Sequence, residues 1–190
     1  EGRDKQFHFD GFRKGVAPHF HVIAGWNDMF LLQSLDDFVE ASRLTDARLT
    51  IYTGGHFGVV MNHAGEVAAE TGRCYREHLA GDVPDRRKAV RMQLITGKEK
   101  GEPPWLECDH WPPPVDDHLE LFLQGTGTTG SLLPEIGEAE LRYTYDPKDP
   151  TPYAGDGWLN LQKDGPQEQR GLETSRTKDL LLLTSDPLES

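Results

Sequence analysis

The feature that most constrains the fold is a strand–helix–strand pattern in the first third of the chain. Residues 18–25 form a short apolar, β-rich run that begins at a proline and ends at a glycine, which predicts a strand. Residues 29–43 place apolar side chains at helical spacing between acidic ones, which predicts an amphipathic helix. Residues 48–53 predict a second strand, ended by two glycines. Because short connections join the three, this is a βαβ unit, whose strands must run parallel.

The remaining sequence changes character near residue 84. Residues 64–79 are compatible with a helix that two glycines weaken, and residues 80–85 resemble a linker. Beyond the linker, short strand candidates alternate with loops rich in Gly, Pro and Asp, and no helical pattern lies among them. The strand candidates are residues 90–95, 119–123, 141–145 and 179–184. We therefore expect a fold of class α/β plus β, with an α/β domain over residues 1–84 and a β-sandwich over residues 85–190.

The charge of the chain excludes several classes of partner. Its 190 residues include 20 Lys and Arg against 32 Asp and Glu, a formal net charge of −12, and the longest basic run is residues 86–88. This balance argues against nucleic acid and anionic lipid as partners. No stretch approaches the roughly 20 apolar residues that a membrane-spanning helix requires, so we expect no membrane span.

Cysteine usage gives a weaker expectation about cofactors and compartment. Cys74 and Cys108 are too few for a disulfide framework and stand in no metal-ligand spacing. We expect neither a cofactor nor a metal. The cytoplasm is the default compartment, and secretion stays an alternative because a native N-terminus is not visible. Self-association into a homo-oligomer is left open.

A carboxylate and an imidazole follow the two strands of the βαβ unit. Asp28 stands three residues past Gly25, and His56 directly follows Gly54 and Gly55. Since parallel strands end at the same edge of a sheet, where ligands gather in α/β proteins, the two loops belong to one edge. A carboxylate that hydrogen-bonds an imidazole fixes its tautomer and stabilises the imidazolium, and Asp before His is also the order in the α/β-hydrolase triad.

Structural interpretations stand beside this catalytic one. Asp28 directly precedes a helix, where Asp is a preferred N-cap, and His56 in a glycine-rich segment is typical of a solvated loop residue. His63 lies seven residues further on and is the weaker candidate for a base. His19 and His21 alternate on one strand face, but no third ligand is placed nearby, which favours a polar strand face over a metal pair.

Both segments resemble parts of a known family. Residues 18–30, PHFHVIAGWNDMF, are similar to the segment that carries the triad Asp in the cocaine-esterase and X-prolyl dipeptidyl-peptidase family of serine hydrolases. Residues 48–56, RLTIYTGGH, resemble that family's Arg-Leu-x-Ile-Gly-Pro-Trp-x-His in register, residue for residue. The resemblance implies that Asp28 is the acid and His56 the base of a Ser-Asp-His triad. The chain departs from the family pattern at Asn27 and at residues 52–54, which alters the expected wall of the pocket.

The resemblance continues into the second half and implies the fold there. The similar segments are residues 75–81, 90–97, 143–152, 165–170 and 179–188. They imply that residues 1–84 are the C-terminal part of an α/β-hydrolase parallel sheet and that residues 85–190 are the first part of a jelly-roll β-sandwich. In this family the nucleophilic Ser lies upstream in a strand-turn-helix elbow, and no Gly-x-Ser-x-Gly occurs here.

The implied function is a serine hydrolase that cleaves an ester or amide, of acyl or X-prolyl dipeptidyl type, with its Ser outside this chain. Its partners would be a small-molecule ester or amide, or a short peptide, and the missing nucleophile-bearing segment, so we expect the isolated chain to be inactive. Trp26, Phe30 and Phe57 border the candidate site, where they line an apolar substrate pocket or belong to the core. The alternative is a non-catalytic β-sandwich binding module on a degenerate hydrolase scaffold.

Overall fold

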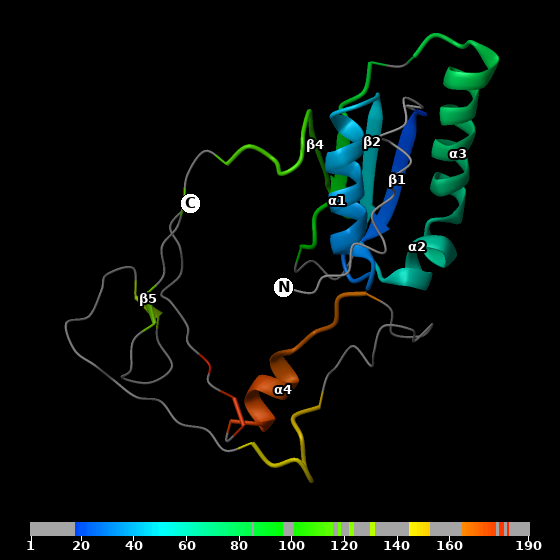
Figure 1. Cartoon of the computed structure of the whole chain (residues 1–190). Helices are drawn as coiled ribbons and strands as arrows, with labels where there is room; N and C mark the ends of the chain where they lie inside the picture. Colours follow the sequence, from blue (N-terminus) through cyan, green and yellow to red (C-terminus); the bar gives the residue numbers. More distant parts are fainter. Residues whose placement is uncertain are drawn as a thin grey trace. The chain divides into compact units, whose positions relative to one another are not determined.

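A computed structural model describes residues 18–84, 86–96, 101–115, 118, 122–123, 130–131, 145–152, 165–177, 179–180 and 182. The chain divides into two compact units, Glu1–Pro114 with Gly155–Pro166 and Val115–Ala154 with Gln167–Ser190. The first unit contains a mixed four-stranded sheet with helices, which is a fold of α/β type (Figure 1).

The strand–helix–strand prediction is confirmed. Strand β1 (Phe20–Gly25) and strand β2 (Ala47–Tyr52) pair in parallel, and helix α1 (Leu31–Ser42) connects them. The register places Phe20 opposite Ala47 and Gly25 opposite Tyr52, so the two strands end at the same level. The loops that follow them therefore begin side by side.

Two further strands extend this sheet, in the order β1-β2-β3-β4. Strand β3 (Val90–Gln93) is parallel to β2, and strand β4 (Trp105–Cys108) is antiparallel to β3. The sequence pattern assigned residues 90–95 to the second domain, whereas β3 is hydrogen-bonded to β2 and the first compact unit continues to Pro114. The apolar side chains of β3 complete the core under α1, which explains the pairing. The two-domain division at residues 84 and 85 stays a prediction.

The helices after β2 differ in part from the expectation. Helix α2 (His56–Asn62) begins directly after Gly55, where the glycine-rich sequence predicted a loop. Helix α3 (Ala64–Tyr75) continues into the π-helical turn η3 (Arg76–Ala80), so the helix expected over residues 64–79 is confirmed. Gly81 ends η3 with a φ of +80°, a backbone conformation that glycine adopts without steric cost.

One face of the sheet is apolar and packs against α1. Alternate residues of β2 and β3 point to this face, as the two-residue period of a strand requires. Partly buried aromatic and aliphatic side chains, among them Trp26 and Trp111, surround it. The buried residues of this hydrophobic core are Phe38, Ala41, Ala47, Leu49, Ile51, Val90, Met92 and Cys108.

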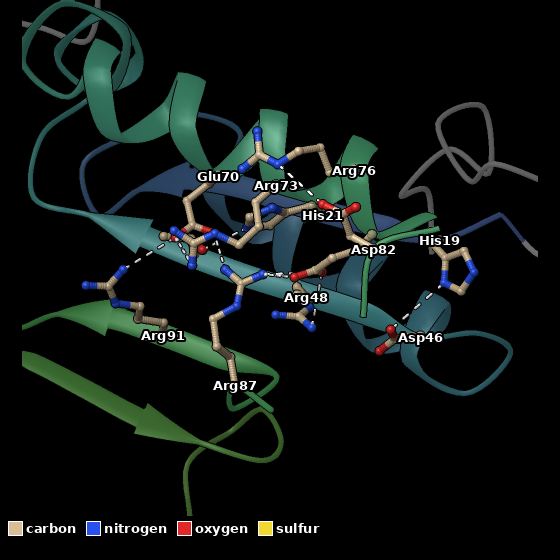
Figure 2. Close-up of polar contacts among 12 residues, drawn as sticks. His19, His21, Asp46, Arg48, Glu70, Arg73, Arg76, Asp82, Arg87 and Arg91 are labelled. Atoms are coloured by element: carbon tan, nitrogen blue, oxygen red, sulfur yellow. Dashed lines mark hydrogen bonds and ion pairs between the residues drawn. The ribbon is translucent and has the colours of Figure 1, made fainter. Parts of the chain in front are cut away.

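The opposite face is charged and lies against α3 and η3. Glu70 and Glu77 are buried there and are paired with arginines of the sheet and of the segment before β3. Figure 2 shows Glu70 among these arginines. Arg87 Nη1 donates to Glu70 Oε2 at 2.6 Å, and Arg87 Nη2 donates to Glu77 Oε1 at 3.1 Å. Arg91 lies 3.6 Å from Glu70, and Arg48 lies 3.6 Å from Glu77. Ion pairs thus hold α3 and η3 to the sheet.

The described part of the second unit contains little regular structure. Strands β5 (Phe122–Leu123) and β6 (Gly130–Ser131) pair antiparallel, and β5 forms the end of the strand expected over residues 119–123. Helix α4 (Arg170–Ser175) lies where the sequence predicted no helix, because six residues are too few to show a helical period. Residues 141–144 lie outside the described part.

Two further expectations concern the strand predicted near the C-terminal end and the absence of a membrane-spanning helix. In the strand expected over residues 179–184, the described residues Asp179, Leu180 and Leu182 are not in a strand. The jelly-roll sandwich stays a prediction. Over the described residues, no helix combines the length and the apolar character needed to cross a membrane.

Candidate active site

Asp28 and His56 meet at the carboxyl edge of the parallel strands. Asp28 lies in the turn between β1 and α1, and His56 is the first residue of α2. The two carboxylate oxygens of Asp28 lie 3.2 and 3.1 Å from His56 Nδ1. The side chain of Asp28 is 12% exposed and that of His56 is 39% exposed, so the pair has a sheltered acid and an accessible imidazole. The proximity expected from the parallel strands is therefore present.

Backbone hydrogen bonds fix the position of the Asp28 carboxylate. The Asp28 N–H donates to the Gly25 carbonyl at 3.0 Å, and the Asp28 carbonyl accepts from Leu31 N–H at 3.1 Å. The Phe30 N–H donates to Asp28 Oδ1 at 2.9 Å. Phe30, and not Asp28, is the N-cap residue of α1, and no side chain caps this helix. The Asp28 carboxylate therefore hydrogen-bonds both the turn before the helix and the imidazole. The interpretation of Asp28 as the N-cap residue is wrong.

The contact with Asp28 determines which nitrogen of His56 is available. A carboxylate can only accept a hydrogen bond, so Nδ1 is the protonated nitrogen and Nε2 of the neutral ring carries the free lone pair. The rings of Phe30 and Phe57 contact the imidazole edge-on, with centroids 5.2 and 5.3 Å away. These contacts and the hydrogen bond hold the ring with Nε2 as the group that can accept a proton.

Two glycines allow the loops to approach closely. A Cβ on Gly25 would lie 2.5 Å from the Gly54 carbonyl oxygen and 2.8 Å from a methyl group of Val59, distances that no side chain tolerates. Gly54 has a φ of +132°, a conformation that favours glycine. The Asn27 N–H donates to the Gly54 carbonyl at 2.9 Å and joins the loop of Asp28 to the loop of His56.

Gln93, which no sequence motif indicated, also joins the two loops. Its side-chain Oε1 accepts from Thr53 N–H at 2.7 Å and from Thr53 Oγ1 at 3.0 Å, in the loop that leads to His56. Its backbone carbonyl accepts from Trp26 Nε1 at 2.6 Å, in the loop that leads to Asp28. Gln93 is buried at the end of β3. The signal that the sequence offers for it is a polar residue within an otherwise largely apolar predicted strand.

His63, the weaker candidate for a base, has a different environment. Its ring stacks on Tyr52 with centroids 4.6 Å apart, and its Nε2 lies 3.3 Å from the Thr53 carbonyl oxygen. Burial raises the pKa of Tyr52 to about 12. His63 therefore packs against Tyr52 and Thr53. Among the described residues, its ring makes no contact with Asp28.

The three aromatic residues expected at the site divide into two groups. Phe30 is 53% exposed and Phe57 is 38% exposed, and both contact His56. Trp26 packs on the apolar core and lies 6.3 Å from Trp111, between ring centroids. Phe30 and Phe57 thus lie against the His56 imidazole, whereas Trp26 packs with the core and donates a hydrogen bond from its indole nitrogen.

A cavity of about 360 Å³ lies beside the same edge of the sheet. Its lining includes Thr53, residues 94–96 and 101–104 of the β3–β4 connection, and Pro166, but not Asp28, His56 or the three aromatic residues. Leu94, Ile95 and three prolines make part of its wall apolar. The cavity and the Asp28–His56 pair are therefore neighbours through Thr53 without sharing a wall.

His19 and His21, considered above as a metal-binding pair, lie in different environments. His21 Nε2 lies 2.9 Å from Thr50 Oγ1, and burial lowers the pKa of His21 from its ordinary value, although the Glu70 carboxylate opposes this shift. His21 is thus part of the charged face. His19 lies instead with Asp46 and His78, so that one ligand atom of each is within 4.8 Å of the others.

The comparisons with known proteins bear on the chemistry of this edge. No family model matches the chain. The chain is similar to cocaine esterase of Rhodococcus sp. (strain MB1 Bresler), with 28% identity over 82% of this chain. It spans 30% of the length of that relative. The similarity supports a relationship to a family of hydrolases.

Proposed function

We propose that this chain is the part of an ester- or amide-cleaving serine hydrolase that supplies the acid and the base of the triad. The observation that carries the proposal is the contact between Asp28 and His56 Nδ1 at 3.1 Å, at the carboxyl edge of parallel strands. The similarity to cocaine esterase, an esterase by name, supports the reaction class. The nucleophilic Ser would come from residues outside these 190.

The proposed roles follow from the hydrogen bonds of the pair. His56 Nε2 takes the proton of the serine hydroxyl as its oxygen attacks the substrate carbonyl, and then returns the proton to the leaving alcohol or amine. Water then attacks the acyl-enzyme while His56 Nε2 takes its proton. His56 returns the proton to the serine oxygen as the carboxylic acid leaves. Asp28 keeps its negative charge throughout, holds Nδ1 protonated and stabilises the imidazolium.

The proposed substrate is a small-molecule ester or amide, or a short peptide, with an apolar group next to the carbonyl. Phe30 and Phe57 support this proposal, because both are exposed aromatic rings in contact with His56. In the same proposal, residues 1–84 correspond to the end of an α/β-hydrolase sheet and residues 85–190 to the start of a jelly-roll sandwich.

A fluorophosphonate probe, which reacts with an activated serine, tests the proposal in the full-length protein that contains this segment. We expect the wild type to be labelled and His56→Ala to lose labelling. Asp28→Asn should retain slow labelling and lower kcat by about 10⁴-fold, because the imidazole then adopts the wrong tautomer.

His63→Gln is the matched control, since it removes the neighbouring imidazole that does not contact Asp28. It should keep kcat within a few fold of the wild type. Undiminished labelling of His56→Ala would overturn the proposed base and favour the non-catalytic module. Loss of labelling in His63→Gln but not in His56→Ala would assign the base to His63.

A further inference from the structure

A second group of ligand-type side chains lies at the amino ends of the strands, opposite the edge that holds Asp28 and His56. It consists of His19, Asp46 and His78, whose ligand atoms lie within 4.8 Å of one another. Among the described residues it is the one group of three such side chains close enough to share a metal ion. We propose that these three residues form a binding site for a divalent transition metal such as Zn²⁺.

The fold brings the first two residues together for the same reason that it pairs Asp28 with His56. His19 directly precedes β1 and Asp46 directly precedes β2, and Phe20 is the register partner of Ala47. The Phe20 N–H donates to the Asp46 carbonyl at 3.3 Å, which ties the two strand beginnings. His19 Nδ1 lies 3.9 Å from Asp46 Oδ2 (Figure 2).

The third residue comes from the helical layer on the charged face. His78 lies in η3, and its ring stacks on that of His19 with centroids 3.6 Å apart and an angle of 13° between the planes. The neighbouring Glu77 is not counted as a ligand because it is paired with Arg48 and Arg87. The three ligands thus come from three separate segments of the chain, which is why no local spacing in the sequence indicates the site.

Two imidazoles and one carboxylate are a ligand set that suits zinc. Zn²⁺ binds His nitrogen at roughly 2.0–2.1 Å and carboxylate oxygen at roughly 2.0–2.2 Å, and sites with three protein ligands complete the tetrahedron with water. Imidazole also suits Ni²⁺ and Cu²⁺, whereas Mg²⁺ prefers a set made only of oxygen. The group carries one carboxylate and no Lys or Arg, so its own charge favours a cation.

Binding requires one small movement. A metal ion lies in the plane of each imidazole that holds it. The rings of His19 and His78 are stacked nearly parallel with centroids 3.6 Å apart, so one ion cannot lie in both ring planes. One ring must therefore rotate about its Cβ–Cγ bond. His19 is exposed, so its ring is the better placed of the two to rotate.

A metal at this position would act as a structural clamp. It would join the beginning of β1, the turn before β2 and the end of the helical layer through one ion. Such a clamp would stabilise the packing of α3 and η3 on the sheet by mass action, since the ion binds the folded arrangement and the unfolded chain holds the three ligands far apart. The inference does not depend on the proposed hydrolase activity.

Calorimetric titration of Zn²⁺ into the metal-free protein tests the site, and Co²⁺ with its visible absorption reports the coordination. We expect one Zn²⁺ per chain at this site, a rise in Tm on binding, and no response to Mg²⁺. His19→Ala, Asp46→Asn and His78→Ala should each weaken the affinity by about tenfold or more, as loss of groups at metal sites does. His19 and Asp46 are exposed and His78 is half-buried, and circular dichroism would verify that each variant is folded.

Two matched controls separate this site from ordinary surface binding. His110→Ala removes an exposed histidine of the same unit and should keep the wild-type affinity. His56→Ala removes the imidazole at the opposite edge and should also keep it. Unchanged affinity in both His19→Ala and His78→Ala would overturn the site, and an equal loss in His110→Ala would identify the binding as nonspecific.

Discussion

The two faces of the four-stranded sheet are built by the same strands and are held by different forces. On the face under α1, aliphatic side chains such as Leu49 and Ile51 pack on Phe38 and exclude water. On the face under α3 and η3, Glu70 and Glu77 are 8% and 4% exposed in their side chains and meet arginines. Neighbouring residues of one strand therefore belong to environments of opposite polarity.

Because of this difference, we expect substitutions in the two helical layers to change stability in different ways. An apolar contact loses stability in proportion to the area and volume removed. A buried ion pair adds little net stability when complete, because desolvation offsets the attraction, but it is costly to break because one charge stays buried alone. The α1 face thus depends on fit, and the α3 face depends on complete pairing.

The largest effect is expected on the apolar face. Phe38→Ala removes a side chain that is 1% exposed and leaves a cavity, so it should lower the free energy of unfolding by about 3–5 kcal/mol. Urea denaturation with and without the substitution measures this. Leu32→Ala, on the exposed side of the same helix, should change the value by no more than about 0.5 kcal/mol. Equal effects of the two substitutions would contradict the assignment of the core face.

Removing one charge from the opposite face should have the next largest effect. Glu70→Gln leaves Arg87 and Arg91 without one of their carboxylates and should lower the free energy of unfolding by about 2–3 kcal/mol. The value lies below that of a fully buried pair because both arginines reach water. Glu66→Gln, exposed one turn earlier on α3, is the control in the same assay. The comparison of faces fails if the two substitutions cost the same.

The charged face should also make stability depend on pH through His21. Burial lowers the pKa of His21 below its ordinary value of 6.5, with Arg87 and Arg48 acting in the same direction and Glu70 and Glu77 opposing. Well above pH 6.5 the ring is neutral in both states and contributes nothing to the pH dependence. As the pH falls below 6.5, the unfolded chain takes up the proton first, so stability declines until the pKa of the folded state is reached.

The variant His21→Gln lacks this titration and should lose less stability between pH 7.5 and pH 5.5 than the wild type. Unfolding by urea at both pH values measures the difference. An identical decline in the two proteins would place the pH dependence elsewhere.

The smallest effect is expected within α3 itself. Gly72→Ala should raise the free energy of unfolding by about 0.5–1 kcal/mol, because alanine favours the helix interior. A Cβ there would meet only Arg76 Nη1, at an ordinary contact distance of 3.6 Å. Thermal denaturation would show the rise. A lower Tm would mean that α3 needs the glycine for its packing on the charged face.

The sequence was informative wherever a simple period controls the structure. The spacing of apolar residues predicted α1, and the β-rich runs predicted β1 and β2 to within two residues. Parallel pairing then predicted that Asp28 and His56 share one edge. A period of this kind depends only on which residues face water, so it survives without knowledge of the rest of the fold.

The sequence was less informative where the structure depends on contacts between segments far apart in the chain. Helix α2 has no side-chain cap and contains glycine, and the glycine-rich segment before it gave no helical signal. The charged residues that alternate with apolar ones along β2 and β3 are typical of a solvent-exposed face, whereas α3 covers them here. Gln93 and the group of His19, Asp46 and His78 acquire their roles only through contacts between segments that are far apart in sequence.

The register of β1 and β2 makes the chain unequally tolerant of changes in length. Between Asp28 and His56 the polypeptide travels through α1 to the far end of the sheet and returns along β2. Residues added in the turn at 43–45 would lengthen this detour and leave both strand ends where they are. One residue added between Gly25 and Asp28 would shift the carboxylate by up to about 3.3 Å, the rise of one strand residue. Related chains should therefore vary in length at the turn and stay constant in length at the carboxyl edge.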